Sequence, residues 1–430
     1  MLLIFFLLIF LLLIFFGCQI GFAMLLSSFI YLLARGGISL TIIPEKITSG
    51  LFSFPLLAIP LFILAGGIMN ASNITKRIFN FCLIFVGNFK GGLAYVNVLG
   101  SMLFAGITGS SVADVAGLGA IEIKAMKDEG YDAGYSVAVT AASSCIGPII
   151  PPSIIMIIIG VMAEVSIGRL FVAGFIPGVL MGISFMFLIY FHSLTKKDMF
   201  PNKTIKKISA KQKLKIIKEG LPAIFSPIII LGGIILGIVT PTEAGVIAVL
   251  YSIVLGFIYK DLTLKGLLKA LKDASFTTGI VMFIIAGAQI FGWVITIERV
   301  AHLLYGFIQS TILAKWVVLL IINIGIIFLG CFIEGVALVM IVVPVLLPII
   351  KALMIDPVQF GAFLAVNVMI GLLTPPVGMS VYIASDLAGI PAIEGFRKSA
   401  IFIIPILVVL FLTTYIPQIS LFLPDLIFGH

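Results

Sequence analysis

A short motif that occurs twice constrains the fold of this chain more than any other feature. Ile146-Gly147 is followed by Pro151-Pro152 within one apolar run. Ile370-Gly371 is followed by Pro375-Pro376 within another, at the same offset (370 − 146 = 224 and 375 − 151 = 224). Tandem prolines interrupt a helix, because proline lacks a backbone N–H and excludes the preceding residue from α geometry. The chain therefore contains two apolar segments that are broken at equivalent points.

Further matches extend this duplication along the chain. The same offset relates Asp132 to Asp356 (356 − 132 = 224) and Phe104-Ala105-Gly106 to Phe328-Leu329-Gly330. A slightly different offset relates residues 62–66 to the similar string that begins at Phe283 (283 − 62 = 221). Four collinear matches indicate two related halves. Hydrophobic segments interrupted by Gly and Pro at corresponding places in two halves are typical of the binding site of a secondary transporter.

The composition identifies a membrane protein. Hydrophobic residues make up 61% of the 430 residues and charged residues only 10%, and the mean hydropathy is +1.30. These values lie far outside the range of soluble domains. Apolar stretches of about 20 residues recur along the chain, which predicts helices, because barrel strands would alternate apolar with polar residues. We therefore expect an all-α polytopic membrane protein.

The first charged residue is Arg35, so residues 1–34 form one long apolar run. As a single helix this run would be roughly 50 Å long at about 1.5 Å per residue. A bilayer core is only about 30 Å thick. We therefore expect a break or a strong tilt near Gly17 or Gly21.

The sequence offers no enzyme signature. It contains no G-x-S-x-G, H-E-x-x-H or Walker A string, which argues against the alternative of an intramembrane enzyme and against an ATP-driven pump. Its cysteines and histidines are dispersed without metal-ligand spacing, so we expect neither a metal centre nor a covalent cofactor. These residues are Cys18, Cys82, Cys145, Cys331, His192, His302 and His430.

Positive charge is concentrated in one loop. Residues 196–218 contain nine lysines and a single acidic residue, Asp198. The next acidic residue along the chain is Glu219. Such a loop can bind nucleic acid or anionic lipid, but in a polytopic membrane protein it more often marks the cytoplasmic side. We interpret it as a cytoplasmic loop of a protein in the bacterial inner membrane.

The region between the halves contains two further local signals. Thr240-Pro241-Thr242-Glu243 is typical of a helix start, with Thr240 as the N-cap and an acidic residue in the first turn. We interpret Glu243 as structural. Residues 260–272 alternate leucines with lysines, which favours a helix that lies in the membrane interface.

Two pairs of short apolar segments predict re-entrant hairpins. Residues 92–107 and 111–121 are joined only by Thr108-Gly109-Ser110, and residues 312–329 and 336–350 are joined through Gly330 to Gly335. A polar turn this short at membrane depth is stable only where protein buries it or where it lines a wet cavity. Each hairpin precedes one of the broken segments. The alternative interpretation of each broken segment is a kinked helix with a purely structural role.

The sequence thus predicts five regions. They are residues 1–54, an N-terminal membrane helix and linker; 55–165, the first repeat, with a hairpin near 92–121 and a broken helix at 135–163; 166–275, scaffold helices and the basic loop; 276–389, the second repeat, with a hairpin near 312–350 and a broken helix at 358–389; and 390–430, a C-terminal helix.

Two carboxylates adjoin the predicted hairpin tips. A charged side chain at the centre of a membrane helix costs about 2.5 to 3.5 kcal/mol on insertion scales. Asp114 and Glu334 are therefore candidates for a role in the transport cycle. They either hold the tips together by accepting backbone N–H bonds or take part in coupling to an ion or substrate. The alternative is a tolerated polar group.

Neutral oxygens surround the same breaks. A break in a helix exposes carbonyls that attract a cation and a helix N-terminus that attracts an anion. Hard cations such as sodium prefer several oxygen ligands, although Ser and Thr hydroxyls also satisfy helix carbonyls. The predicted sodium-binding residues are Thr108, Ser110, Ser111, Gly147, Pro148, Gly330, Thr374 and Gly378, and the predicted substrate region consists of Ser143, Ser144, Asn367, Pro151, Pro152, Pro375 and Pro376.

With these motifs in place, the chain resembles the large membrane subunit of tripartite ATP-independent periplasmic (TRAP) transporters. The resemblance covers nearly the whole chain and comprises a series of motifs. They are Phe54-Pro55-Leu56-Leu57-Ala58-Ile59-Pro60-Leu61-Phe62, Asn97-Val98-Leu99, residues 104–114 (FAGITGSSVAD), residues 147–153 (GPIIPPS), Thr240-Pro241-Thr242-Glu243-Ala244 and residues 371–378 (GLLTPPVG).

The resemblance implies an elevator-type carrier, in which a mobile domain with two inverted hairpins moves against a scaffold and sodium drives transport. It also implies two partners: a separate four-helix membrane subunit and a periplasmic protein that delivers an organic acid. Members of the family carry C4-dicarboxylates, sialic acid or keto acids. The second hairpin of the family usually carries Asp where this chain has Glu334, which leaves the role of that carboxylate open. A stand-alone ion-coupled carrier of organic anions is the alternative within transport.

Overall fold

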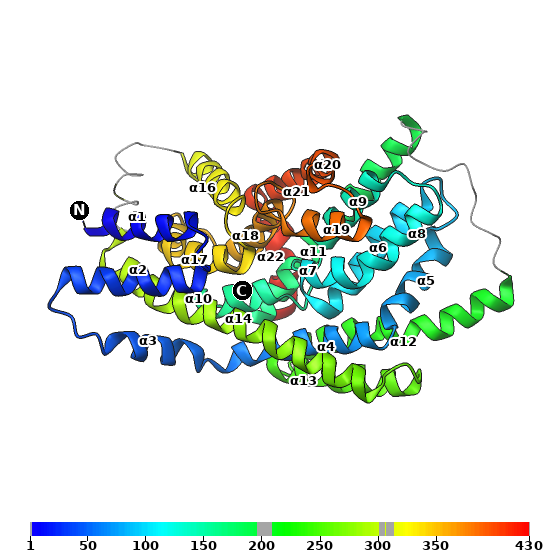
Figure 1. The fold of residues 1–430 in the computed structure, drawn as a ribbon, viewed down its shortest axis with the longest axis horizontal. Coiled ribbons are helices and arrows are strands. Elements are labelled where there is room, and N and C mark those ends of the chain that lie inside the picture. Colours follow the sequence, from blue (N-terminus) through cyan, green and yellow to red (C-terminus); the bar gives the residue numbers. More distant parts are fainter. Residues whose placement is uncertain (1, 196–208, 301–305, 307–313, 430) are drawn as a thin grey trace.

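The computed structural model describes residues 2–195, 209–300, 306 and 314–429, and within these ranges all regular structure is helical (Figure 1). The predicted all-α membrane class is confirmed. The long N-terminal run is divided into α1 (Leu2–Phe15) and α2 (Ile20–Arg35), which pack against each other. The break falls at Gly17, whose φ of +80° favours glycine. Helix α3 (Ile42–Leu51) then leads into the first repeat.

The first half of the chain continues through a series of helices. It comprises η1 (Phe54–Leu57), α4 (Ala58–Ala71), α5 (Ile74–Val86), α6 (Gly92–Thr108), α7 (Ser111–Asp114), the π-helical turn η2 (Val115–Gly119), α8 (Ala120–Asp128), α9 (Ala133–Ser144), α10 (Ile154–Ala163) and α11 (Ile167–Thr195).

The second half follows two connecting helices. The connectors are α12 (Ala210–Ile235) and α13 (Pro241–Ile258); the second half comprises α14 (Leu264–Ile297), α16 (Lys315–Gly330), α17 (Gly335–Ala352), α18 (Pro357–Gly371), α19 (Met379–Ala388), α20 (Ala392–Ser399), η4 (Ala400–Phe402), α21 (Ile403–Tyr415) and α22 (Pro417–Phe428).

The helix boundaries follow the duplication found in the sequence. Ala133 and Pro357, which begin α9 and α18, are separated by the motif offset (357 − 133 = 224), as are the first residues of α7 and α17 (335 − 111 = 224). Asp132 accepts a hydrogen bond from the Tyr135 backbone N–H at 2.8 Å, and Asp356 accepts one from the Val358 N–H at 2.6 Å. The repeated aspartates are therefore N-caps of equivalent helices, a role that Asp fills well.

The hairpin of each half packs on the broken helix of the other half. Helix α17 packs on α10, and α7, η2 and α8 pack on α19 (Figure 1). Within each half, α6 packs on α9 and α16 packs on α18. The two halves thus form one interlocked core. Movement of this core as an elevator stays a prediction.

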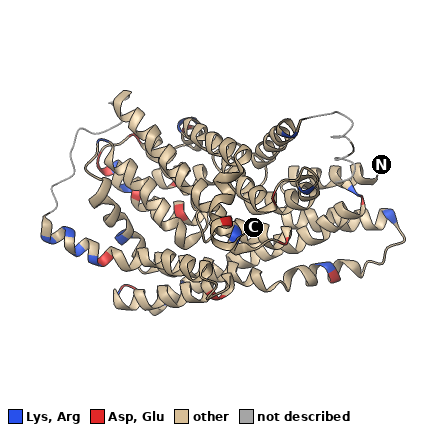
Figure 2. Ribbon diagram, turned by 180° about the vertical axis from the view of Figure 1, so that it is seen from behind, with Lys and Arg blue, Asp and Glu red and all other residues tan. Residues whose placement is uncertain are grey.

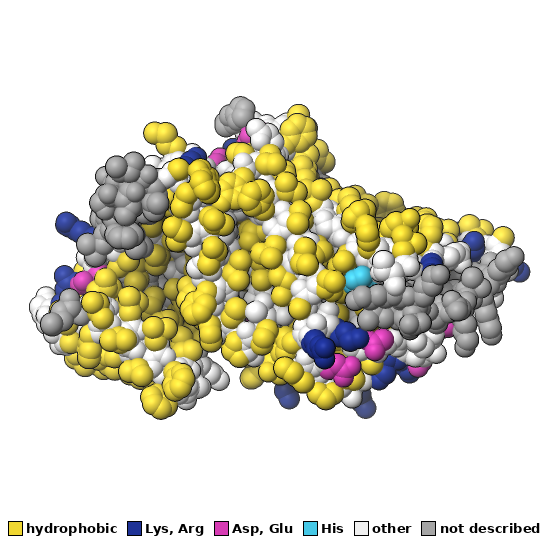
Figure 3. Space-filling model, turned by 90° about the horizontal axis from the view of Figure 1, so that it is seen from above, with side chains coloured by type: hydrophobic (Ala, Val, Ile, Leu, Met, Phe, Trp, Pro, Cys, Tyr) yellow, Lys and Arg dark blue, Asp and Glu magenta, His cyan; other side chains and the backbone are white. Residues whose placement is uncertain are grey.

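The outer surface is suited to lipid. Six of the described helices are long and apolar enough to cross a membrane, among them α11, α13 and α17. Large hydrophobic side chains such as Phe187 (64% exposed) and Phe257 (59%) point outward, and hydrophobic side chains cover most of the face in Figure 3. Charged residues are few and mostly lie near the ends of helices (Figure 2).

The predicted cytoplasmic loop lies partly outside the described residues, which resume at Ser209. The described part places four lysines in the first turns of α12, at positions 211, 213, 215 and 218 (Figure 2). Residues 264–272 of the predicted interfacial stretch form the first turns of the 34-residue helix α14. The Tyr259 hydroxyl donates to the Glu219 carbonyl at 2.6 Å and Arg77 pairs with Asp261 at 2.6 Å. We call this part of the molecule, where α12 and α14 begin, the lysine end.

The helix start predicted at Thr240 is present. The Thr240 hydroxyl accepts from the Glu243 N–H at 3.3 Å, and the Glu243 carboxylate accepts from the Thr240 N–H at 2.7 Å. This reciprocal pair is a capping box. The structural interpretation of Glu243 is confirmed.

Candidate functional site

The tip of the first hairpin lies against the unwound loop between α9 and α10. Gly109 has φ +58°, and a Cβ at this position would lie 2.3 Å from the Pro152 carbonyl oxygen. A Cβ on Gly147 would lie 3.5 Å from the Ser110 carbonyl oxygen. Glycine at these places lets two backbones approach closely. The structure thus brings together the two segments for which sodium binding was predicted.

The tip of the second hairpin makes an equivalent approach to the loop between α18 and α19. A Cβ on Gly371 would lie 2.3 Å from the Gly330 carbonyl oxygen. The Val377 N–H donates to the Cys331 carbonyl at 3.2 Å. Gly378, with φ +26°, is the N-cap of α19. We call these two contacts the first and second junctions. In both loops the Pro-Pro bond is cis, at Pro151-Pro152 and Pro375-Pro376.

A cluster of hydroxyls extends the first junction across the halves. Ser111, at the start of α7, lies 2.8 Å from the Ser144 hydroxyl on α9 and 2.8 Å from the Ser380 hydroxyl on α19. All three side chains are buried. Ser111 therefore joins the first hairpin to the broken helices of both halves.

Two hydroxyls of the predicted sodium set differ in their partners. The Thr374 hydroxyl donates to the Ile370 carbonyl one turn earlier, at 2.7 Å, which is the local role that Ser and Thr often have in membrane helices. The Thr108 hydroxyl oxygen is buried and has no hydrogen-bond partner among the described residues. Because a buried polar atom without a partner is costly, the Thr108 hydroxyl has a free oxygen to offer a cation.

The predicted substrate residues on α9 and α18 are buried in helix contacts. Ser143 donates to the Asn97 side-chain oxygen on α6 at 2.6 Å. The equivalent residue in the second half is Asn367 (367 − 143 = 224), which donates to the Asn323 side-chain oxygen on α16 at 2.8 Å. Both bonds hold a broken helix against the first limb of its own hairpin. The side-chain oxygen of Asn367 has no partner in the described part of the chain.

The two predicted carboxylates occupy different environments. Glu334 accepts from the Val336 and Ala337 N–H groups at 3.1 and 3.3 Å and thus caps α17. Its counterpart by offset is Ser110 (334 − 110 = 224), which caps α7 by accepting from the Ala113 N–H at 3.4 Å. Glu334 therefore caps the second limb of its hairpin, and its role in the transport cycle stays a prediction.

Asp114 is a separate case. It lies four residues past the cap, is 1% exposed, and neither of its carboxylate oxygens accepts a hydrogen bond within 3.5 Å from the described residues. The Ser101 hydroxyl on the facing helix α6 lies beside this carboxylate and donates to the Ser143 hydroxyl at 3.1 Å. The backbone-capping role proposed for Asp114 is thus not the one that the structure shows, because its position lies inside the helix.

Sequence reasoning missed several polar residues of this core. Asn97, Asn323 and Ser380 are buried partners of predicted residues, and Glu122 is 1% exposed, with its Oε1 atom 2.9 Å from where a Cβ on Gly100 would lie. Glu122 ends an apolar segment, where a charge usually marks the edge of the membrane. For Asn97, Asn323 and Ser380 the available signal was a polar residue inside an otherwise apolar segment.

The interlocked hairpins and broken helices define a polytopic membrane transporter, and comparisons with known proteins identify the family. The profile of the family "Tripartite ATP-independent periplasmic transporter, DctM component" matches residues 7–419. The chain therefore belongs to this family, whose members are large permease subunits. It is a multi-pass protein of the bacterial inner membrane and a transport protein rather than an enzyme.

Curated relatives match along almost the whole chain. The sialic acid TRAP transporter large permease protein SiaM of Vibrio cholerae is 39% identical over 97% of both chains. The sialic acid TRAP transporter permease protein SiaT of Haemophilus influenzae is 40% identical over 98% of this chain and 68% of its own length. The C4-dicarboxylate TRAP transporter large permease protein DctM of Pseudomonas aeruginosa is 37% identical over 86% of both chains.

Solved structures resemble the fold at much lower identity. The YdaH transporter of Alcanivorax borkumensis has a TM-score of 0.63 at 13% identity and covers 90% of both chains. MtrF of Neisseria gonorrhoeae has a TM-score of 0.52 at 14% identity, over 87% of this chain and 83% of its own. These likenesses concern the fold alone.

Proposed function

We propose that this chain is the permease of a sodium-coupled symporter that imports an organic acid anion. The observation that carries the proposal is the pair of junctions at which a hairpin tip meets an unwound loop. Each junction gathers carbonyl and hydroxyl oxygens, the ligands that a hard cation prefers. The buried, unpartnered Thr108 hydroxyl fits a cation ligand at the first junction.

The same junctions suit an anionic substrate. Helices α10 and α19 begin directly after the unwound loops, so the positive ends of their dipoles face the region between the tips. A carboxylate near these ends and sodium near the exposed carbonyls would stabilise each other. Sialic acid and C4-dicarboxylates, for which relatives are named, are organic acids of this kind.

We also propose that the chain acts with two partners, a small four-helix membrane subunit and a periplasmic binding protein. A tripartite family and relatives named as large permease proteins support this assignment. The lysine end marks the cytoplasmic side by the positive-inside rule. The binding protein would then dock on the opposite, periplasmic face, and the core would move as an elevator against α4, α12 and α13.

Staged reconstitution tests the function. Proteoliposomes that contain this chain alone, then with the small subunit, then with the binding protein as well, are given an inward gradient of sodium or of potassium. Uptake is expected only with all three proteins and only with sodium. Robust uptake by the chain alone would instead support a stand-alone carrier, and equal uptake with potassium would contradict sodium coupling.

Substitutions at the two junctions refine this test. Ser110→Ala and Thr374→Ala are expected to raise the sodium concentration required for half-maximal uptake. Ser49→Ala, on the exposed surface of α3, is the matched control and should leave it unchanged. Sodium titrations that coincide for all three variants would count against the assignment.

A further inference from the structure

Along one face of helix α12, positive charge gives way to apolar side chains. Lys211, Lys215 and Lys218 follow one another at spacings that place them in one row on the helix surface (215 − 211 = 4 and 218 − 215 = 3). All three are exposed. The same face continues with Phe225, which is 45% exposed, and with Ile229, which is 41% exposed. The face thus passes from charged to apolar along the helix axis.

Two tyrosines, one in α13 and one directly after it, indicate where this face crosses the membrane boundary. The Tyr259 hydroxyl donates to the Glu219 carbonyl at 2.6 Å, and the Tyr251 hydroxyl donates to the Pro222 carbonyl at 2.7 Å. Tyrosine is enriched at membrane–water interfaces, where its ring lies in an apolar layer and its hydroxyl in a polar one. This part of α12 therefore marks the boundary. The lysine row lies on its polar side, and the apolar part of the face lies on the other side.

The lysine row is unfavourable for the helix by itself. Like charges one turn apart repel each other, and cations in the first turns oppose the helix dipole, whose positive end is the N-terminus. The first turn of α12 contains no acidic residue. Lys215 pairs with Glu219 at 3.8 Å, but the two side chains are 76% and 45% exposed, so the pair contributes little. An external anion would offset this charge.

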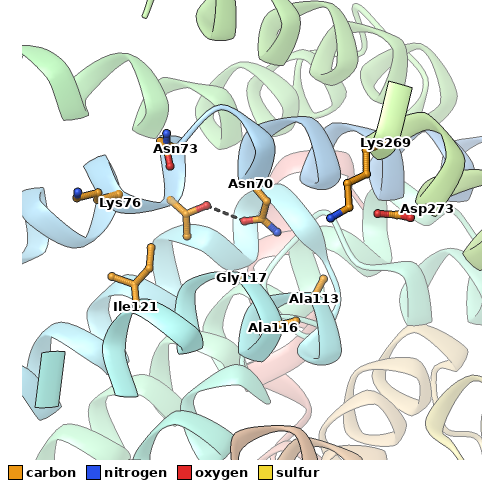
Figure 4. Close-up of a pocket in the computed structure, with 10 residues that line it drawn as sticks. Asn70, Asn73, Lys76, Ala113, Ala116, Gly117, Ile121, Lys269 and Asp273 are labelled. Carbon is orange, nitrogen blue, oxygen red and sulfur yellow. Dashed lines mark hydrogen bonds between the residues drawn. The ribbon is translucent and has the colours of Figure 1, made fainter. Parts of the chain in front are cut away.

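Helix α14, which begins at the same end of the molecule, shows a similar order. Lys265 and Lys272 lie on one face, and the exposed Phe276 follows one turn later (272 − 265 = 7 and 276 − 272 = 4). Lys269 of the same helix lines a cavity beside the first hairpin together with Asp273 (Figure 4). Because a carboxylate accompanies that lysine, the excess of positive charge is larger on α12.

The order of the groups on α12 selects one kind of anion. Along the membrane normal, a phospholipid has its phosphate and then its acyl chains, in the same order as the lysines and the apolar residues of this face. A soluble anion would use the lysines alone. We propose that this face binds an anionic phospholipid of the cytoplasmic leaflet, with the phosphate on the lysine row and an acyl chain along Phe225 and Ile229. Lysines near the membrane surface strengthen binding to anionic lipid.

Fluorescence quenching tests this proposal without any transport. Phe225→Trp places a reporter in line with the lysine row, in a background in which Trp293 and Trp316 are replaced by Phe. Nanodiscs of phosphatidylcholine hold the purified permease and the same small mole fraction of either brominated phosphatidylglycerol or brominated phosphatidylcholine. Bromine on the acyl chains quenches a tryptophan that it contacts. Quenching at Phe225→Trp should favour phosphatidylglycerol about tenfold, because several lysines act together.

A second reporter and two sets of substitutions are the matched controls. Phe22→Trp, on the exposed side of α2 in the uncharged N-terminal run, should show no preference between the lipids. Replacement of the three lysines of the row by Gln should abolish the preference at Phe225→Trp, whereas replacement by Arg should keep it. A charge-matched triple variant, Lys90→Gln, Lys315→Gln and Lys351→Gln, changes exposed positions outside α12 and should leave the preference unchanged.

Three results would overturn the proposal. The first is equal quenching by the two lipids at Phe225→Trp, or a preference that survives the loss of the lysine row. The second is competition by glycerol phosphate in solution, which would mean that the lysines bind a phosphate without its acyl chains. The third is a loss of quenching by both lipids when the small membrane subunit is added, which would assign this face to that partner. None of these results depends on whether sodium drives uptake.

Discussion

The two junctions have matching backbones but different side-chain chemistry. At both, a glycine without room for a Cβ lets a hairpin tip touch an unwound loop, at Gly109 in the first and Gly371 in the second. The first is tied to both halves by the Ser111 hydroxyl. The second is joined by a backbone bond from Val377 and has a carboxylate, Glu334, as the cap of its hairpin limb. Duplication thus preserved the close backbone contacts, while the polar groups around them diverged.

The close backbone contacts should be the features that both junctions need most. Gly109→Ala and Gly371→Ala each place a methyl group 2.3 Å from a carbonyl oxygen. Overpacking of this kind typically costs about 1–3 kcal/mol, so we expect uptake to fall at least about tenfold in both. Uptake by reconstituted protein is the measurement.

Gly325→Ala is the matched control for these two variants. This glycine lies within α16 and a Cβ there would meet nothing within 4 Å, so uptake should stay near the level of the unchanged protein. A loss of uptake in only one of the two junction variants would show that the two junctions are not equivalent.

The stability of the first junction should depend on the hydroxyl cluster of Ser111, Ser144 and Ser380. Ser111→Ala removes two hydrogen bonds, and Ser380→Ala removes one of them. Because each hydrogen bond contributes about 0.5–1.5 kcal/mol, we expect a lower melting temperature in both single variants. The double variant should lose less stability than the two single variants lose together, because they share one of the bonds. Thermal unfolding of the four proteins measures this coupling. Strict additivity would mean that the two hydroxyls do not interact.

The cap of the second hairpin allows a smaller test that separates structure from charge. Glu334→Ala should lose about 1 kcal/mol of stability, as expected for a lost N-cap, and Ser110→Ala should lose a similar amount at the first hairpin. Glu334→Gln keeps an acceptor oxygen and should be nearly as stable as the unchanged protein. The rate of amide hydrogen exchange in the first turn of α17 measures whether the cap is intact.

The glutamine variant then shows whether the charge itself is needed. If Glu334→Gln keeps its stability but loses uptake, the carboxylate takes part in the transport cycle. Uptake at the unchanged rate in both Glu334→Gln and Asp114→Asn would show that the two charges are bystanders.

The sequence predicted the features that depend on local signals. Gly17, the short turn at Gly109 and the paired prolines are interruptions that act on the backbone around them, so the breaks could be located without a structure. The 224-residue spacing also predicted which helices correspond.

Features that depend on contacts between distant segments could not be predicted. Ser380 reaches Ser111 only because the halves interlock, and nothing near either residue indicates this. Glu122 is buried at the end of an apolar segment, and hydropathy does not show which side of a helix is buried. Asp114 and Glu334 were grouped because each adjoins a predicted hairpin tip, whereas the repeat offset pairs Glu334 with Ser110.

Direct binding of sodium at the first junction tests the central claim most directly. The melting temperature of the purified permease is measured against NaCl, with choline chloride at equal ionic strength as the control, because a ligand that binds the folded state raises stability as its concentration rises. We expect sodium to stabilise the protein, and Thr108→Val, which keeps the shape of the side chain without its hydroxyl, to require about tenfold more sodium for the same shift. Identical responses to sodium and choline, or an unchanged sodium response in Thr108→Val, would contradict the account.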